Sequence, residues 1–170
     1  MKKKYYIAII IIIIVLLVGV LYFFTPNGKT LENREEILRN SPSGKYVWEI
    51  DKEIKLYDYI ISSVYGTTKD GLAVFKSTGN GKYKLQSVGY KEKGKVVIEQ
   101  IIHQEKVIYI AWCNQPNLDY AEVVYTIDNE ELKPRIYDVK ENSFISFQSP
   151  SDDLVMRITY YDKDGNHMIK

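Results

Sequence analysis

The stretch Val107-Ile108-Tyr109-Ile110-Ala111-Trp112-Cys113 decides the fold, because every one of its residues is apolar or aromatic. In an extended strand, successive side chains point to opposite faces of the sheet. The odd-numbered residues of this stretch then share one face and the even-numbered residues share the other, so both faces are apolar. This pattern predicts a central strand that is covered on two sides.

Short apolar runs separated by Gly, Asn and Asp lie on both sides of this strand. Their spacing and hairpin-like connections are typical of an antiparallel, mainly β domain that resembles a sandwich. The candidate strands are residues 45–50, 72–77, 83–90, 96–103, 107–113, 120–127, 133–139, 143–148 and 154–161. The clearest turns are predicted at residues 69–71, 79–81 and 164–166, because Gly and Asn accept the positive φ of tight hairpins.

Residues 51–65 fit two structures. Ile54, Tyr57, Ile61 and Val64 recur at the spacing of a helix face, whereas residues 59–65 are rich in residues that favour strands. Periodicity alone does not separate the two. We expect a short helix or turn that leads into a strand near residue 60.

Residues 5–24 are aliphatic, aromatic or alanine, with the single exception of Gly19. A helix of this length spans about 30 Å, the thickness of the hydrocarbon core of a bilayer. A cleaved signal peptide has a shorter apolar region and ends at small residues, which the bulky sequence Leu21-Tyr22-Phe23-Phe24 does not offer. The sequence therefore predicts an uncleaved transmembrane helix that contacts the lipid bilayer through residues 5–24.

The flanks of this span predict its orientation and the start of the exported part. Three lysines lie in residues 1–4, and the positive-inside rule keeps such a basic flank in the cytoplasm. Residues 25–44 predict a turn-rich linker with a short helix that Thr30 caps. This helix is either a juxtamembrane spacer, which we expect, or a helix that binds a partner. Residues 45–170 form the predicted extracytoplasmic β-rich domain.

Three segments carry a resemblance to a class of known proteins. They are Gly71-Leu72-Ala73-Val74-Phe75, the run from Ile108 through Asn114-Gln115-Pro116-Asn117 to Val123, and Tyr161-Asp162-Lys163-Asp164-Gly165-Asn166. Together with the basic N-terminus and the apolar span, they resemble uncharacterised single-pass, membrane-anchored exported proteins of low-GC Gram-positive bacteria. The resemblance implies a location in the cell membrane and a β-rich exported domain, and it implies no activity.

Composition and motifs exclude several kinds of chemistry. The chain has 23 Lys and Arg against 22 Asp and Glu, so it lacks the basic surplus that binding to nucleic acid requires. His103 and His167 lie on separate predicted strands, and no C-x-x-C or H-E-x-x-H spacing indicates a metal site. The segment from Asp162 to Asn166 begins like a calcium loop but lacks its later ligands, which favours a hairpin turn. We therefore expect no metal and no cofactor.

Catalytic motifs are equally lacking in the sequence. No serine lies in a G-x-S-x-G elbow, and no glycine-rich loop has the spacing that binds nucleotides. Cys113 is a candidate nucleophile, but its place in the most apolar strand favours a packing role, because burial disfavours the thiolate. The sequence therefore assigns no catalytic residue, and we expect a protein that is not an enzyme.

The chain is rich in aromatic residues, with 15 Tyr, 5 Phe and 2 Trp. Tyrosines on a sheet can bind sugars or protein partners, but they also fill half-buried strand positions, which we favour here. The loop that follows the central strand is the candidate partner-binding loop, because it carries several amide side chains. Its candidate residues are Asn114, Gln115, Asn117, Asp119 and Tyr120.

These features predict a membrane-anchored extracytoplasmic binding or accessory module without its own catalysis. Its expected partner is another membrane protein or an envelope component. An immunity-type protein that protects its own cell against a secreted toxin is one specific version. The alternative is an enzyme that acts on the envelope with scattered carboxylates, and a third hypothesis gives the span itself a function within the bilayer.

Overall fold

The computed structural model describes residues 10–17, 26–139, 144–149 and 155–168. Residues 10–17 are helical. No helix within these described ranges combines the length and the apolar character that crossing a bilayer requires. The predicted cytoplasmic flank at residues 1–4 and the remaining parts of the predicted span at 5–24 lie outside the described residues.

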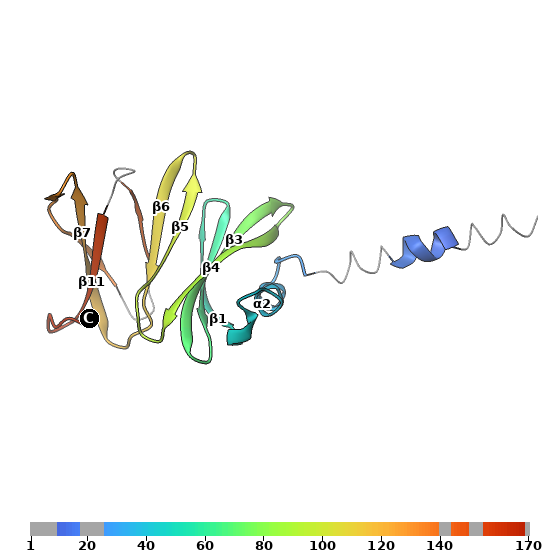
Figure 1. Cartoon of the computed structure of the whole chain (residues 1–170), viewed down its shortest axis with the longest axis horizontal. Coiled ribbons are helices and arrows are strands. Elements are labelled where there is room, and N and C mark those ends of the chain that lie inside the picture. Colours follow the sequence, from blue (N-terminus) through green and yellow to red (C-terminus); the bar gives the residue numbers. More distant parts are fainter. Residues whose placement is uncertain (1–9, 18–25, 140–143, 150–154, 169–170) are drawn as a thin grey trace, which may run out of the picture.

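In the part of the chain from residue 26 onward that the structure describes, three antiparallel sheets pack together with the short helix α2 (Figure 1). Sheet A contains, in spatial order, β1 (Glu49–Leu56), β2 (Tyr59–Tyr65), β3 (Lys69–Gly79) and β4 (Lys82–Glu92). Sheet B contains β10 (Ile145–Gln148), β6 (Lys106–Trp112) and β5 (Val97–His103). Sheet C contains β11 (Val155–Asp162), β7 (Leu118–Ile127) and β8 (Glu130–Glu131), and β9 (Arg135–Asp138) also pairs with β7. Helix α2 (Leu31–Arg39) and the 3-10 helix η1 (Gly44–Tyr46) precede sheet A.

Three buried clusters show how these layers pack. Tyr59, Ile61, Leu72 and Val74 of sheet A pack against Ile101, Ile108, Ile110 and Trp112 of sheet B. Ile145 and Phe147 of sheet B, with Cys113, pack against Val123, Tyr125 and Tyr160 of sheet C. Leu38 of α2 packs with Trp48, Val64, Ala73 and Phe75 on the outer face of sheet A. Figure 1 shows the resulting order, with α2 and sheet C at opposite ends of the stack.

The mainly β, antiparallel fold is confirmed, and so is the central place of the stretch that decides it. Ile108 and Ile110 of β6 belong to the cluster with sheet A, while Tyr109 packs against the cluster with sheet C. Strand β6 pairs with β5 on one side and with β10 on the other. Sheet B has a covering sheet on each side because both faces of β6 are apolar and each requires a covering layer.

The strand expected near residue 60 is present as β2 and follows a turn at residues 57–58, but the short helix expected at the start of residues 51–65 is wrong. Residues 49–56 form β1, which pairs with β2 from Glu49 opposite Tyr65 to Leu56 opposite Tyr59. The two strands join at Tyr57, whose φ is 56°. Strand pairing satisfies the backbone, and Ile54 packs against the core between sheets A and B, so tertiary contacts outweigh the helical spacing. The strand expected at residues 45–50 is also displaced, because residues 44–46 form η1.

The turn expected at residues 69–71 is wrong as well, because these residues open β3. Asp70 pairs with Tyr65 of β2 and with Lys91 of β4. Its side chain is fully buried, and Oδ2 accepts hydrogen bonds from Gly94 N at 2.9 Å and from Asn114 Nδ2 at 3.3 Å. This capture of the carboxylate explains why an Asp-Gly pair lies within a strand. The turns at 79–81 and 164–166 are confirmed, with a φ of 52° at Asn80 and 80° at Gly165.

Candidate binding groove

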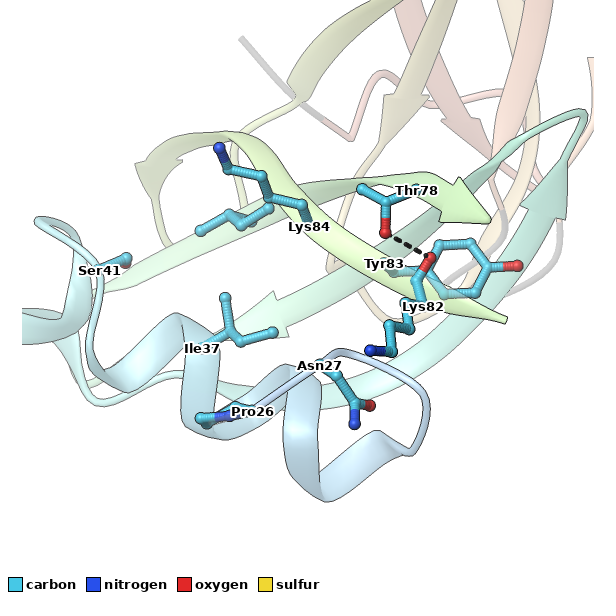
Figure 2. Close-up of a pocket in the computed structure, with 9 residues that line it drawn as sticks. Pro26, Asn27, Ile37, Ser41, Thr78, Lys82, Tyr83 and Lys84 are labelled. Carbon is cyan, nitrogen blue, oxygen red and sulfur yellow. Dashed lines mark hydrogen bonds between the residues drawn. The ribbon is translucent and has the colours of Figure 1, made fainter. Parts of the chain in front are cut away.

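Three hollows lined in part by lysines lie along β4, and Figure 2 shows the one between α2 and β4. This hollow has a volume of about 440 Å³. It is lined by Pro26, Asn27, Ile37, Ser41, Thr78, Lys82, Tyr83, Lys84 and Leu85. Two further hollows share Leu85 with it and add Lys45 and Lys76 to the lining. We call the three hollows together the basic groove.

The segment that enters the domain from the N-terminal side forms one wall of the groove. Asn27 O accepts a hydrogen bond from Tyr83 N of β4 at 2.9 Å. Gly28 follows with a φ of 68°, and a Cβ at this position would lie 2.4 Å from Tyr83 O. Only glycine permits this close approach with a left-handed backbone. The segment is therefore fixed beside β4 from its first described residues.

Helix α2 forms the opposite wall. Thr30 is its N-cap and accepts a hydrogen bond from Asn33 N at 3.3 Å, which satisfies one of the free N–H groups of the first turn. Ile37 and Ser41 then lie on the side of the groove. In Figure 2, Ile37 and Lys82 point into the space between α2 and β4.

A buried arginine holds α2 on sheet A. The guanidinium of Arg34 donates to both carboxylate oxygens of Glu53 on β1, with Nε to Oε1 at 2.8 Å. Its Nη1 also donates to Gly28 O at 2.6 Å, and only 6% of the residue is exposed. Ser62 of β2 donates a further hydrogen bond to Glu53 at 2.7 Å. Helix α2 is thus part of the packed body, and the entering segment is attached to it.

The charges of the groove have one sign. Lys45, Lys76, Lys82 and Lys84 line its three hollows, and no Asp or Glu is among the described lining residues. Lys76 and Lys84 pair across β3 and β4 and lie on the face opposite to α2, where Lys76 Nζ is 5.4 Å from the centre of the Tyr59 ring. Ile37 and Leu85 supply apolar surface on the α2 side of the sheet. Among the residues that the structure describes, the lining contains neither histidine nor cysteine. Such a lining can bind an anionic group, and its described residues include no carboxylate.

The whole-chain charge hides this groove from sequence analysis. The net charge is only +1, yet residues 71–91 contain Lys76, Lys82, Lys84 and Lys91 without a single Asp or Glu. A local count over this hairpin would have shown the imbalance. The contribution of residues 26, 37 and 41 has no sequence signal, because it depends on how α2 packs against sheet A.

The predicted partner-binding loop is divided between inward and outward side chains. Asn114 Nδ2 donates to Asp70 Oδ2 of β3 at 3.3 Å, and Gln115 Nε2 donates to Gly94 O, in the turn before β5, at 3.0 Å. Asn117, with a φ of 65°, and Asp119 are exposed. Tyr120 stacks on Tyr161 with ring centroids 4.7 Å apart. The loop carries two exposed polar side chains, and a partner role for it stays a prediction.

The titratable groups considered in the sequence analysis each contact other parts of the protein. Cys113 is 1% exposed, and burial, with a smaller effect of the negative charge of Asp70, raises the pKa of its thiol to about 12. His103 stacks on Tyr57, and its Nδ1 lies 3.6 Å from Asp58 Oδ1. Asp162 accepts backbone hydrogen bonds from Asp164 and Asn166, as a turn residue does. Within the described ranges, no three His, Cys, Asp or Glu residues gather as metal ligands.

One carboxylate is half-buried between sheets A and B. Glu99 of β5 accepts a hydrogen bond from Ser87 Oγ of β4 at 2.7 Å. Burial raises the pKa of Glu99 above its usual value, and the hydrogen bond from Ser87 opposes this shift.

Comparisons with protein-family models, curated proteins and solved structures find no match for this chain.

Proposed function

We propose that this protein is a single-pass membrane protein whose β domain lies outside the cytoplasm and acts as a binding or accessory module without its own catalysis. Residues 10–17 support the anchor, because they form a helix of aliphatic residues whose exposed fractions range from 49% to 63%. A helix that is apolar on every side requires an apolar environment. The apolar sequence continues over residues 5–24, and the lysines before it favour a cytoplasmic N-terminus.

The basic groove is the observation that carries the binding role. It combines lysines from β3, β4 and η1 with apolar side chains, and it begins at Pro26, the first residue described after the apolar segment. The alternative function, an enzyme acting on the envelope, needs two carboxylates roughly 5 to 10 Å apart in one concave site. The described lining residues of the groove supply none. An anionic partner in the membrane or the envelope fits this groove better than a substrate does.

The anchor is tested on the full chain with a C-terminal tag in a Gram-positive host. We expect the protein to stay in membranes washed with carbonate, and protease added to intact cells to remove the tag. The matched control carries Ile12→Lys and Val15→Lys, each of which opposes insertion by roughly 2.5 to 3.5 kcal/mol. A tag that resists protease on intact cells, or wild-type protein released by carbonate, would overturn the proposed location.

The binding role is tested by cross-linking in native membranes. Three forms are compared: the wild type, a form in which residues 5–24 are exchanged for an unrelated anchor, and the groove variant K82Q/K84Q. We expect the first two to capture the same component and the groove variant to lose it, while K106Q/K133Q on other surfaces retains it. Capture that depends only on the native anchor would place the function in the span. Capture of a secreted toxin would identify the immunity-type version.

A further inference from the structure

We propose that the outer face of sheet C binds an arginine side chain from a positively charged segment of a protein partner. We call this surface the tyrosine platform, and it consists of Tyr120, Glu122, Ile136, Asp138 and Tyr161. It lies at the end of the stack away from α2 (Figure 1) and shares no residue with the basic groove. The inference therefore goes beyond the proposed function. Its open face, its aromatic row and its charge carry it.

Strand alternation places these side chains on the face of sheet C that points away from sheet B. Tyr125 of β7 and Tyr160 of β11 belong to the buried cluster between the two sheets. Side chains at positions 120 and 122 of β7 and at 161 of β11 therefore point the other way. Ile136 of β9 pairs with Glu122 and is 61% exposed, and Asp138 is exposed as well. The described elements thus leave this sheet face open to solvent.

A row of four side chains crosses the platform. Asp138 of β9 pairs with Tyr120 of β7, which pairs with Tyr161 of β11, and Tyr161 forms an isolated bridge with His167. The rings of Tyr120 and Tyr161 are stacked, with centroids 4.7 Å apart and 9° between their planes. This distance is close to the spacing of neighbouring strands, so the rings face each other across the sheet. The second face of the Tyr120 ring is therefore directed towards β9 and Asp138.

The charges on this face favour a cation. Arg157 of β11 is the only Lys or Arg that alternation places on this face of the described strands, and its Nη2 lies 3.5 Å from Glu131 Oε1 of β8. Glu122 and Asp138 form no ion pair with a described residue. The end of the face that holds the stacked tyrosines therefore presents two carboxylates to a partner.

A guanidinium fits this arrangement better than an ammonium does. It is planar, so it can stack on the free face of Tyr120 and donate paired hydrogen bonds to a carboxylate beside the ring. Asp138 is the cross-strand neighbour of Tyr120, and Glu122 lies about 7 Å further along β7. A cation on the ring would thus lie between two carboxylates. Ile136 offers apolar contact to the methylene stem of the arginine.

The size of the face indicates a short segment of a partner. Its three strands span roughly 10 Å, and the eight residues of β11 extend over about 26 Å. The resulting area, roughly 260 Å², is well below the ~800 Å² that each protein buries in a standard interface. A loop or tail that contains arginine matches this area. A second copy of this chain does not, because its own Glu122 and Asp138 would meet like charges.

The test measures the binding of short peptides to the full chain in phosphatidylcholine nanodiscs. The probe is an acetylated and amidated Gly-Arg-Gly-Arg-Gly peptide with an uncharged dye, and binding is read by fluorescence anisotropy. In the matched peptide, citrulline replaces both arginines and keeps their planar shape without the charge. A third peptide carries lysine at both positions. Phosphatidylcholine has no net charge and does not attract the cationic peptides.

We expect the arginine peptide to bind at least about fivefold more tightly than the citrulline and lysine peptides. The variant E122Q/D138N should weaken its binding by roughly fivefold, because two ion pairs at the surface are lost. Tyr120→Leu should weaken it by roughly two- to fivefold. The control E36Q/E49Q removes two exposed carboxylates at the other end of the stack and should bind as the wild type does.

Equal binding of the arginine and citrulline peptides would overturn the inference, and so would equal losses in E122Q/D138N and E36Q/E49Q. A lysine peptide that binds as tightly as the arginine peptide would overturn the assignment to a guanidinium. Carbodiimide labelling of carboxylates locates the peptide without any substitution. The bound peptide should slow the labelling of Glu122 and Asp138 and leave Glu36 unchanged, and uniform slowing would contradict the site.

The outcome is separate from the fate of the proposed function. The groove variant K82Q/K84Q keeps the tyrosine platform intact, so it should bind the arginine peptide as the wild type does. Loss of peptide binding in this variant would overturn the platform as the site. A groove variant that keeps its envelope partner would instead refute the role of the basic groove and leave the peptide result unaffected.

Discussion

Replacing Arg34 with methionine tests whether α2 and the entering segment are attached to sheet A as the structure indicates. Methionine keeps the unbranched stem but removes four donated hydrogen bonds, two to Glu53 and one each to Gly28 O and Lys29 O. The variant also leaves the Glu53 carboxylate without its cation, although 22% of that side chain remains exposed. The whole attachment of α2 to β1 is therefore expected to weaken.

The size of the effect follows from these contacts. Each hydrogen bond to a charged group contributes roughly 1.5 to 3 kcal/mol to stability. Adding this value for all four bonds would overestimate the loss, because the acceptors that Arg34 releases form hydrogen bonds with water instead. Breaking one partner of a buried ion pair costs about 3 to 5 kcal/mol. The partial exposure of Glu53 places Arg34→Met near the lower limit, at about 3 kcal/mol. Arg39→Met on the same helix is the matched control, and we expect a change within about 0.5 kcal/mol because Arg39 is exposed.

The assay is urea unfolding of the full chain in detergent micelles, followed by tryptophan fluorescence. Trp48 reports on the layer beneath α2, and Trp112 reports on the core between sheets A and B. Comparing single-tryptophan forms shows whether α2 detaches before the sheets unfold. A double-mutant cycle with Glu53→Gln should give a coupling of about 2 kcal/mol. A loss below 1 kcal/mol for Arg34→Met, or strict additivity with Glu53→Gln, would refute the attachment.

Three further predictions concern stability and reactivity. Val47 is 61% exposed and has a φ of 54°, a left-handed conformation that is strained for a β-branched residue. Val47→Asn should therefore stabilise the protein by about 1 kcal/mol in the same assay, whereas Val155→Asn in strand β11 should not. A lower stability for Val47→Asn would contradict the backbone strain at this position. The raised pKa of Cys113, about 12, keeps the thiol protonated in the fold, so maleimide should label it only in urea, and stability should fall as pH rises from 9 towards 12; labelling of the folded protein would contradict this. Burial raises the pKa of Glu99, which means that the fold favours its protonated form, and the stability that this form confers is lost as pH rises through that pKa. Glu99→Gln should therefore raise the melting temperature at pH 7 and have a smaller effect near pH 4, and an equal decrease at both pH values would refute this.

The sequence predicts the strands and turns that depend mainly on the residues within them. The two apolar faces of β6 require covering layers on both sides, and the structure has them in sheets A and C. The Gly79-Asn80-Gly81 turn is predictable because its residues accept positive φ without cost. Strand β1 is not predictable in this way. Its sequence, Glu-Ile-Asp-Lys-Glu-Ile-Lys-Leu, is mostly charged, and it is a strand because β2 pairs with it at an edge of sheet A.

The candidate site depends almost wholly on tertiary structure. Lys82 and Lys84 are visible in the sequence, but Ile37 and Ser41 reach the same groove only because Arg34 and Leu38 fix α2 on sheet A. In the predicted partner-binding loop, the sequence signal was visible but misleading. Its amides at Asn114 and Gln115 suggested a surface that binds a partner, yet both donate hydrogen bonds within the protein because Asp70 and Gly94 lie beside them.

The attachment of α2 changes how an exchanged anchor should be interpreted. If the domain hung on a flexible tether, any anchor joined anywhere before residue 45 would serve equally well. Here the entering segment is bonded to Tyr83 and to Arg34, so residues 26–39 set the orientation of the domain as well as its distance from the membrane. An anchor exchanged at residue 24 should preserve the capture of the same component by cross-linking. Insertion of a flexible Gly-Ser segment after residue 39 leaves these contacts of the entering segment and α2 intact, whereas insertion at residue 25 separates them from the span. Only the second insertion should reduce this capture, and equal effects of the two insertions would show that binding does not depend on the orientation of the domain.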